Sequence, residues 1–77
     1  MMADKMYLKK ASFIAFELEN LVRKIDDDIV KLEPIANDSV DDVVAVAVWY
    51  GDGSGFKVNV ECDSLSAIVI DVIKRIQ

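Results

Sequence analysis

The chain has 77 residues, of which 14 are acidic and 9 basic, so its formal net charge is −5. This balance opposes direct binding to nucleic-acid phosphates or to anionic lipid, and the length predicts one small domain, residues 1–77, with a thin core. The sequence contains no histidine and one cysteine, Cys62, which excludes an intramolecular disulfide and a zinc site built from cysteines.

The N-terminal segment carries three lysines before a short apolar run, which Glu17 interrupts. We therefore expect no export signal. The longest apolar run, residues 43–50, is far shorter than the roughly 20 residues of a membrane-spanning helix. These features and the lone thiol predict a soluble cytoplasmic protein without membrane contact.

Residues 5–33 contain no glycine or proline and are followed by Pro34, which predicts one long helix with Asp4 as its N-cap. An apolar stripe follows one side of it: Tyr7, Ala11, Ile14, Leu18, Leu21, Val22, Ile25, Ile29 and Leu32. Such a helix would be about 43 Å long in a domain about 30 Å across. We expect it either to break, at Asp26-Asp27-Asp28, or to overhang.

Two phenylalanines, Phe13 and Phe16, fall on the polar back of this predicted helix. Together they form an apolar patch, and we expect them to bind a partner. Lysines near the N-terminal end and aspartates near the C-terminal end oppose the helix dipole. An antiparallel second copy would compensate, so the sequence predicts a homodimer centred near Leu18 and Glu19, unless the phenylalanines lie under the second helix.

Residues 43–62 predict a β-hairpin. Its first strand, 43–50, is apolar at every position, whereas residues 56–62 alternate between apolar and polar. Residues 51–55 hold all three glycines and predict the connecting turn. Cys62 continues the apolar face of the second strand, so we expect a buried, unreactive thiol.

A second helix follows, with Asp63 or Ser64 as its cap and Leu65, Ile68, Val69, Val72 and Ile76 as its stripe. The expected order is α-β-β-α and the fold class α+β. The first strand needs cover on both faces. Either the helices lie on opposite faces of the hairpin, or two hairpins pair across a twofold axis into a four-stranded sheet, which we favour. Trp49 would pack in the core or against a partner.

No catalytic or cofactor-binding set stands out. The loop Gly51–Gly55 leads into a strand and not into the helix that a phosphate loop requires, and it lacks calcium-loop spacing. Side chains of Asp26, Asp27 and Asp28 on a helix would diverge by 100° per residue, so no metal site is expected. The serines have no histidine to serve as a base. We expect a non-enzymatic protein without a cofactor.

The leading hypothesis is therefore a small acidic module that binds proteins. Its expected partner-binding residues are Phe13, Phe16, Asp26, Asp27, Asp28 and Trp49. One alternative is an inhibitor from a phage or mobile element that mimics nucleic acid through its aspartates, including Asp38, Asp41, Asp42 and Asp52. Another is a small metal-dependent factor that uses the loop Gly51–Gly55.

Overall fold

The computed structural model describes residues 9–36, 42–61 and 63–76. Residues 9–25 are helical, and a π-helical segment, η1 (Phe13–Leu18), continues there into helix α2 (Glu19–Ile25). The elements that follow are β1 (Ile29–Ala36), β2 (Val43–Tyr50), β3 (Gly55–Asn59) and α3 (Leu65–Ile76). The predicted α+β class, hairpin and C-terminal helix are confirmed. The order, however, is α-β-β-β-α, because the hairpin gains a third strand.

The predicted helix over residues 5–33 is too long. It ends at Ile25, and the backbone turns at the aspartate run: Ile29 N donates to Asp26 O, and Asp28 N donates to Asp26 Oδ1. Two β-branched residues, Ile29 and Val30, then open strand β1. The helix therefore ends at the aspartate run, where the sequence predicts a break, but the residues that follow form a strand and do not continue as a helix.

Pro34 lies inside β1 and does not follow a helix. The sheet order is β1-β2-β3, so β1 is an edge strand. Leu32 donates its N–H to Glu19 Oε1 at 2.9 Å and not to β2, and Pro34 is two residues further along the same strand. The missing N–H of Pro34 therefore falls on the free edge, where no ladder bond is lost.

Two register shifts in the antiparallel pairing of β1 with β2 change which side chains face inward. Ile29 opposes Tyr50 and Lys31 opposes Trp49, so Val30 is the extra residue of a β-bulge. This bulge lets Ile29 and Leu32, three residues apart, both point into the core, although a regular strand alternates every two residues. The same spacing made them fit a helical stripe.

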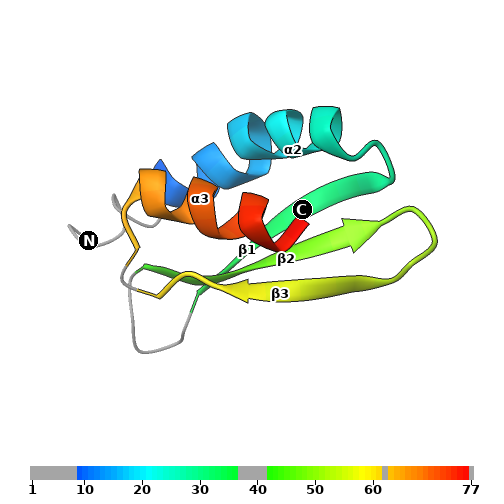
Figure 1. Cartoon of the computed structure of the whole chain (residues 1–77). Helices are drawn as coiled ribbons and strands as arrows, with labels where there is room; N and C mark the ends of the chain where they lie inside the picture. The colour runs from blue at the N-terminus through cyan, green and yellow to red at the C-terminus, as the bar shows by residue number, and fades with distance from the viewer. Residues whose placement is uncertain (1–8, 37–41, 62, 77) are drawn as a thin grey trace.

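Both helices pack on one face of the sheet (Figure 1). The alternative with helices on opposite faces of the hairpin, the less favoured of the two, is therefore wrong. The core between helices and sheet contains aliphatic side chains from every element: Ile14, Leu18, Val22, Ile29, Leu32, Val43, Val46, Val48, Val58, Val60, Ile68 and Val72. Burying them is the main stabilising contribution to the fold. The other face of the sheet has no helix in the part of the chain described.

The π-helical segment changes the phase of the first helix. Glu19 N donates to Ile14 O, five residues earlier, which places more residues in the turn than an α-helix holds. Residues at a spacing of four therefore stay on the inner side: Lys10, Ile14, Leu18 and Val22 are buried. Leu21 and Ile25, which the regular helix assigns to the stripe, are 42% and 41% exposed.

Some predictions fall on residues outside the described ranges, namely Asp4 as a helix cap and Cys62 as a buried thiol. Within the described residues, none of the helices is long and apolar enough to cross a bilayer.

Candidate protein-binding surface

The outer face of the sheet, opposite the helices, is the candidate binding surface. Side chains alternate along β2: Val46 and Val48 belong to the core, so Ala45, Ala47 and Trp49 lie on the outer face. Their register partners complete that face from the two edge strands: Lys31, Glu33 and Ile35 of β1 with Gly55, Lys57 and Asn59 of β3. The centre is therefore small and apolar, and the flanks carry charge.

Trp49 lies flat across this face. Its Nε1 donates to Glu33 Oε1 of β1 at 3.2 Å, while on the other side its Cε3 lies 3.1 Å from where a Cβ on Gly55 of β3 would stand. The indole thus bridges the sheet from one edge strand to the other and stays 39% exposed. Trp49 was expected to pack in the core or against a partner, and the structure excludes the core.

Gly55 makes room for this arrangement. A Cβ at this position would collide with the Val48 carbonyl oxygen and press on the Trp49 ring. A shallow hollow of about 120 Å³ opens beside the indole and is lined by Ala47, Val48, Trp49, Gly55, Phe56 and Lys57. The hollow is the concave part of the outer face.

The two phenylalanines expected at a partner interface have separate environments. Phe13 is half-buried and packs against the core, whereas Phe16 is 69% exposed. The predicted dimer centre is also displaced, because Leu18 is buried and Glu19 binds the edge of β1. Leu18 therefore cannot lie at the centre of a helix interface as predicted, and of this set Phe16 remains on the surface.

The aspartate run does bring its carboxylates together, contrary to the argument from helix geometry. Asp26, Asp27 and Asp28 occupy a turn, and their ligand atoms lie within 4.8 Å of one another. A hollow of about 400 Å³ beside them is also lined by Asp52 of the β2–β3 turn. Two of these carboxylates already stabilise turns: Asp26 Oδ1 accepts from Asp28 N, and Asp52 Oδ1 accepts from Ser54 N and Oγ. The Ser54 hydroxyl lowers the pKa of Asp52 most, followed by the Ser54 N–H.

The Gly51–Gly55 segment is a tight turn, as predicted. Tyr50 N donates to Ser54 O, Gly53 N donates to Tyr50 O, and Gly53 has a φ of 92°, which favours glycine. This geometry serves chain reversal between β2 and β3.

Acidic residues are split between the two ends of the sheet. The run Asp26–Asp28 meets the end of β2, since Gly51 N donates to Asp28 O, whereas Asp42 immediately precedes the start of that strand. An eight-residue strand separates these ends by roughly 25 Å. Of the aspartates that nucleic-acid mimicry would use, those in the described residues therefore lie at both ends of the sheet.

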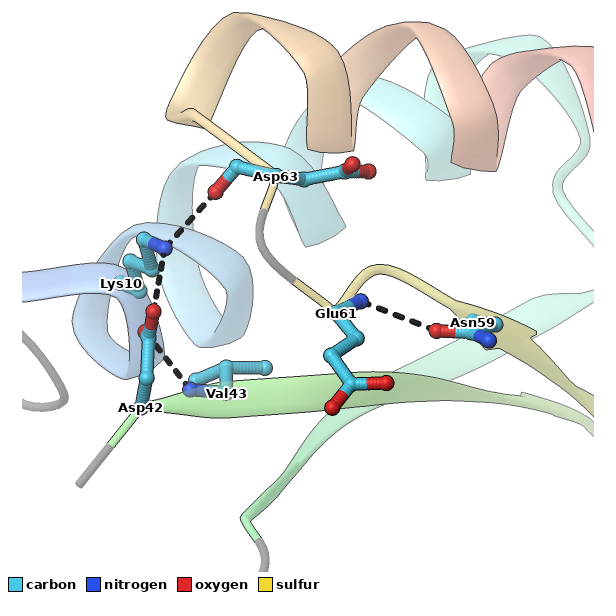
Figure 2. A network of polar contacts seen from close by, with 6 residues as sticks. All are labelled: Lys10, Asp42, Val43, Asn59, Glu61 and Asp63. Atoms are coloured by element: carbon cyan, nitrogen blue, oxygen red, sulfur yellow. Dashed lines mark hydrogen bonds and ion pairs between the residues drawn. The ribbon is translucent and has the colours of Figure 1, made fainter. Parts of the chain in front are cut away.

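Asp42 belongs instead to a polar cluster with Lys10 (Figure 2). The Lys10 Nζ is 2.8 Å from Asp42 Oδ2 and donates to Asp63 O at 2.7 Å, and the lysine is only 5% exposed. Burial by itself raises the pKa of Asp42. Hydrogen bonds from Lys10 and from the Val43 N–H, together with the charge of Lys10, outweigh this effect, so the pKa of Asp42 lies below its ordinary value. The cluster ties the N-terminal helix to the starts of β2 and α3.

The carboxyl of Asp63 faces a second carboxyl. Its Oδ2 is buried without a hydrogen-bond donor in the described part of the chain, and Asp71 of α3 lies against it. Two carboxylates can only accept, so a hydrogen bond between them requires a shared proton. Contact with Asp71, then burial, therefore raises the pKa of Asp63, while Lys10 opposes the rise.

The charged flanks of the outer face were not among the residues expected from the sequence. Glu33 was assigned to the end of a helix, so nothing indicated that it lies across the sheet from Lys57. The alternation of Lys57 with Phe56 and Val58 does mark it as outward-facing in the hairpin. Only the pairing of β1 with β2 adds Glu33 and Lys31 to the same face.

The chain matches no protein-family model, no curated protein and no solved structure.

Proposed function

We propose that this protein is a non-enzymatic protein-binding module whose contact surface is the outer face of its sheet. The observation that carries the proposal is the position of Trp49, an exposed indole on the central strand of a sheet face that no described helix covers. Tryptophan is enriched among residues that dominate binding energy at protein interfaces.

The local geometry supports a rigid contact surface. Trp49 is bonded to Glu33 and rests beside Gly55, so its side chain loses little conformational freedom on binding. Ala45 and Ala47 leave the centre low, although Ala47 is itself only 3% exposed, and Lys31, Glu33 and Lys57 form a charged rim. An apolar centre within a polar rim is the usual anatomy of a protein interface.

The alternatives receive less support. Nucleic-acid mimicry needs spaced charge on one face, whereas the described aspartates lie at both ends of the sheet. A metal-dependent role rests on Asp26, Asp27 and Asp28, of which the last two are exposed and the first caps a turn. Exposed acidic groups in turns are common without an ion, so the binding surface stays the better-supported site.

Site-specific photocrosslinking in the native host tests this proposal. The photoreactive residue p-benzoylphenylalanine replaces Lys31, which is exposed on the outer face, and in a matched variant it replaces Lys74, which is exposed on α3. We expect the Lys31 position to give a discrete crosslinked protein band and the Lys74 position to give none, because only the outer face contacts a partner. Mass spectrometry of the band identifies what was bound.

Crosslinking from the Lys74 position alone, or from neither position, would contradict the proposal. Circular dichroism spectra of both variants must match the wild type, so that loss of fold is not mistaken for loss of contact.

A further inference from the structure

We propose that the occupant of the outer face is a second copy of this chain, packed sheet against sheet about a twofold axis that runs nearly parallel to β2. This inference rests on the proposed function, since it names the partner of the same surface. Its basis is that the rows of side chains across the face are complementary to themselves under that rotation.

The row through Ala47 carries the charge complementarity. Glu33 of β1 and Lys57 of β3 flank Ala47 on opposite sides, and both are exposed. A twofold axis above Ala47 and along β2 exchanges left and right, so Glu33 of each copy faces Lys57 of the other. An axis perpendicular to the strands would instead place Glu33 against Glu33 and Lys57 against Lys57, which is repulsive. Charge therefore selects the axis.

The neighbouring row through Trp49 carries the shape complementarity. Lys31 of β1 and Gly55 of β3 flank Trp49, so a long side chain stands on one side and no side chain on the other. The same rotation places the Lys31 side chain of one copy above Gly55 of the other, at the 120 Å³ hollow beside the indole. There the lysine stem fills the depression, and its ammonium group meets the aromatic ring.

The sheet edges are less suited to self-association than the face. Glu19 accepts the outward N–H of Leu32 and so blocks the edge of β1, and β3 is only five residues long with Lys57 at its centre. Short strands and charged side chains are common protection against edge pairing. Aligned sheets pack about 10 Å apart with strands crossing at about 30°, so an axis about 15° from β2 keeps the central rows opposed.

Sedimentation velocity over a concentration series tests the dimer. A three-stranded face is smaller than a standard interface, so we expect the wild type to be a weak dimer that is populated at high micromolar concentration. Each single charge reversal, Glu33→Lys or Lys57→Glu, turns two attractive contacts per dimer into two repulsive ones. We expect each to raise the dimer dissociation constant about tenfold or more.

Mixing the two variants provides the decisive control. When the Glu33→Lys chain meets the Lys57→Glu chain, position 33 and position 57 are oppositely charged at both contacts, so the mixture should dimerise although neither variant does so alone. Reversal of Lys74, on the helix side, should change nothing. The double variant with both reversals in one chain should recover wild-type dimerisation.

A wild type that remains monomeric at high micromolar concentration, or a mixture that remains monomeric while the wild type dimerises, overturns this inference. Such a result does not remove the binding module itself, because crosslinking of a different protein from the Lys31 position would still support the outer face as a contact surface. Absence of any crosslink from that position would contradict both.

Discussion

At the scale of residues, the pair of facing carboxyls, Asp63 and Asp71, makes stability depend on pH. The raised pKa of Asp63 means that the folded state binds a proton more tightly than the unfolded state. Its stabilising contribution is therefore complete below the unfolded pKa, near pH 4, and is lost as pH rises through the higher folded pKa. Once the proton has left, the two carboxylates repel each other.

Asp71→Asn should remove this repulsion, because an amide N–H can donate to Asp63 Oδ2 without a shared proton. We expect the free energy of unfolding at pH 7 to rise by about 1 kcal/mol or less. In the wild type, lowering the pH from neutral toward about pH 4 protonates the pair and stabilises the fold, and this pH-dependent gain should disappear in the variant. Urea denaturation at several pH values measures both effects.

Glu17→Gln is the control for Asp71→Asn, since it changes the net charge equally at an exposed helical position. Equal effects of the two substitutions on the pH dependence would mean that overall charge, and not the carboxyl pair, is responsible.

At the scale of elements, each boundary has a local chemical cause. The first helix ends where Asp26 and Asp28 close a turn, and β2 reverses into β3 where Gly53 adopts a positive φ. Ser64 caps the start of helix α3: its Oγ accepts Ala67 N at 3.2 Å and its carbonyl accepts Ile68 N at 2.9 Å. Of the two caps expected from the sequence, Ser64 is the one that serves.

Ser64→Ala should destabilise the protein by about 1 kcal/mol, the usual cost of removing an N-cap. The loss reaches the core because α3 carries Ile68 and Val72 into it. Ser12→Ala offers a matched comparison, since Ser12 is exposed within the first helix and makes no capping bond. Alanine favours helix there, so Ser12→Ala should be neutral or slightly stabilising. Thermal unfolding followed by circular dichroism compares them, and an equal loss from both would contradict the cap.

At the scale of the whole molecule, one layer of helices covers one face of one sheet. The way the N-terminal helix packs on the sheet separates its two phenylalanines: Phe13, in the π-helical segment, contacts the core, whereas Phe16 is exposed to solvent. The two side chains, which look equivalent in the sequence, should therefore respond differently to the same substitution.

Phe13→Ser should lower the free energy of unfolding by about 2–3 kcal/mol, because a half-buried aromatic contact with the core is lost and a hydroxyl replaces it. Phe16→Ser should change stability by less than about 0.5 kcal/mol, as is usual for surface substitutions. Chemical denaturation gives both values. Similar losses would place Phe16 in the core and contradict its exposure.

Much of the fold follows from the sequence alone, because its determinants are local. The alternation of Phe56, Val58 and Val60, the glycine-rich turn before them and the serine ahead of α3 each act within a few residues. These features predict the hairpin, the C-terminal helix and the α+β class. They also predict Trp49 on the face opposite Val46 and Val48, although not what else shares that face.

The tertiary structure alone decided that residues 29–36 form a strand, and therefore which side chains make up the outer face. Ile29 and Leu32 suit a helix at a spacing of three and suit a strand only if a bulge at Val30 is present, so their pattern is ambiguous. A strand must satisfy its backbone groups on a neighbour, and the neighbour here is β2, from the next segment of the chain. Pairing with β2 therefore brings Lys31 and Glu33 beside Trp49. This placement depends on hydrogen bonds to a strand elsewhere in the chain, so no short stretch of sequence contains the information that determines it.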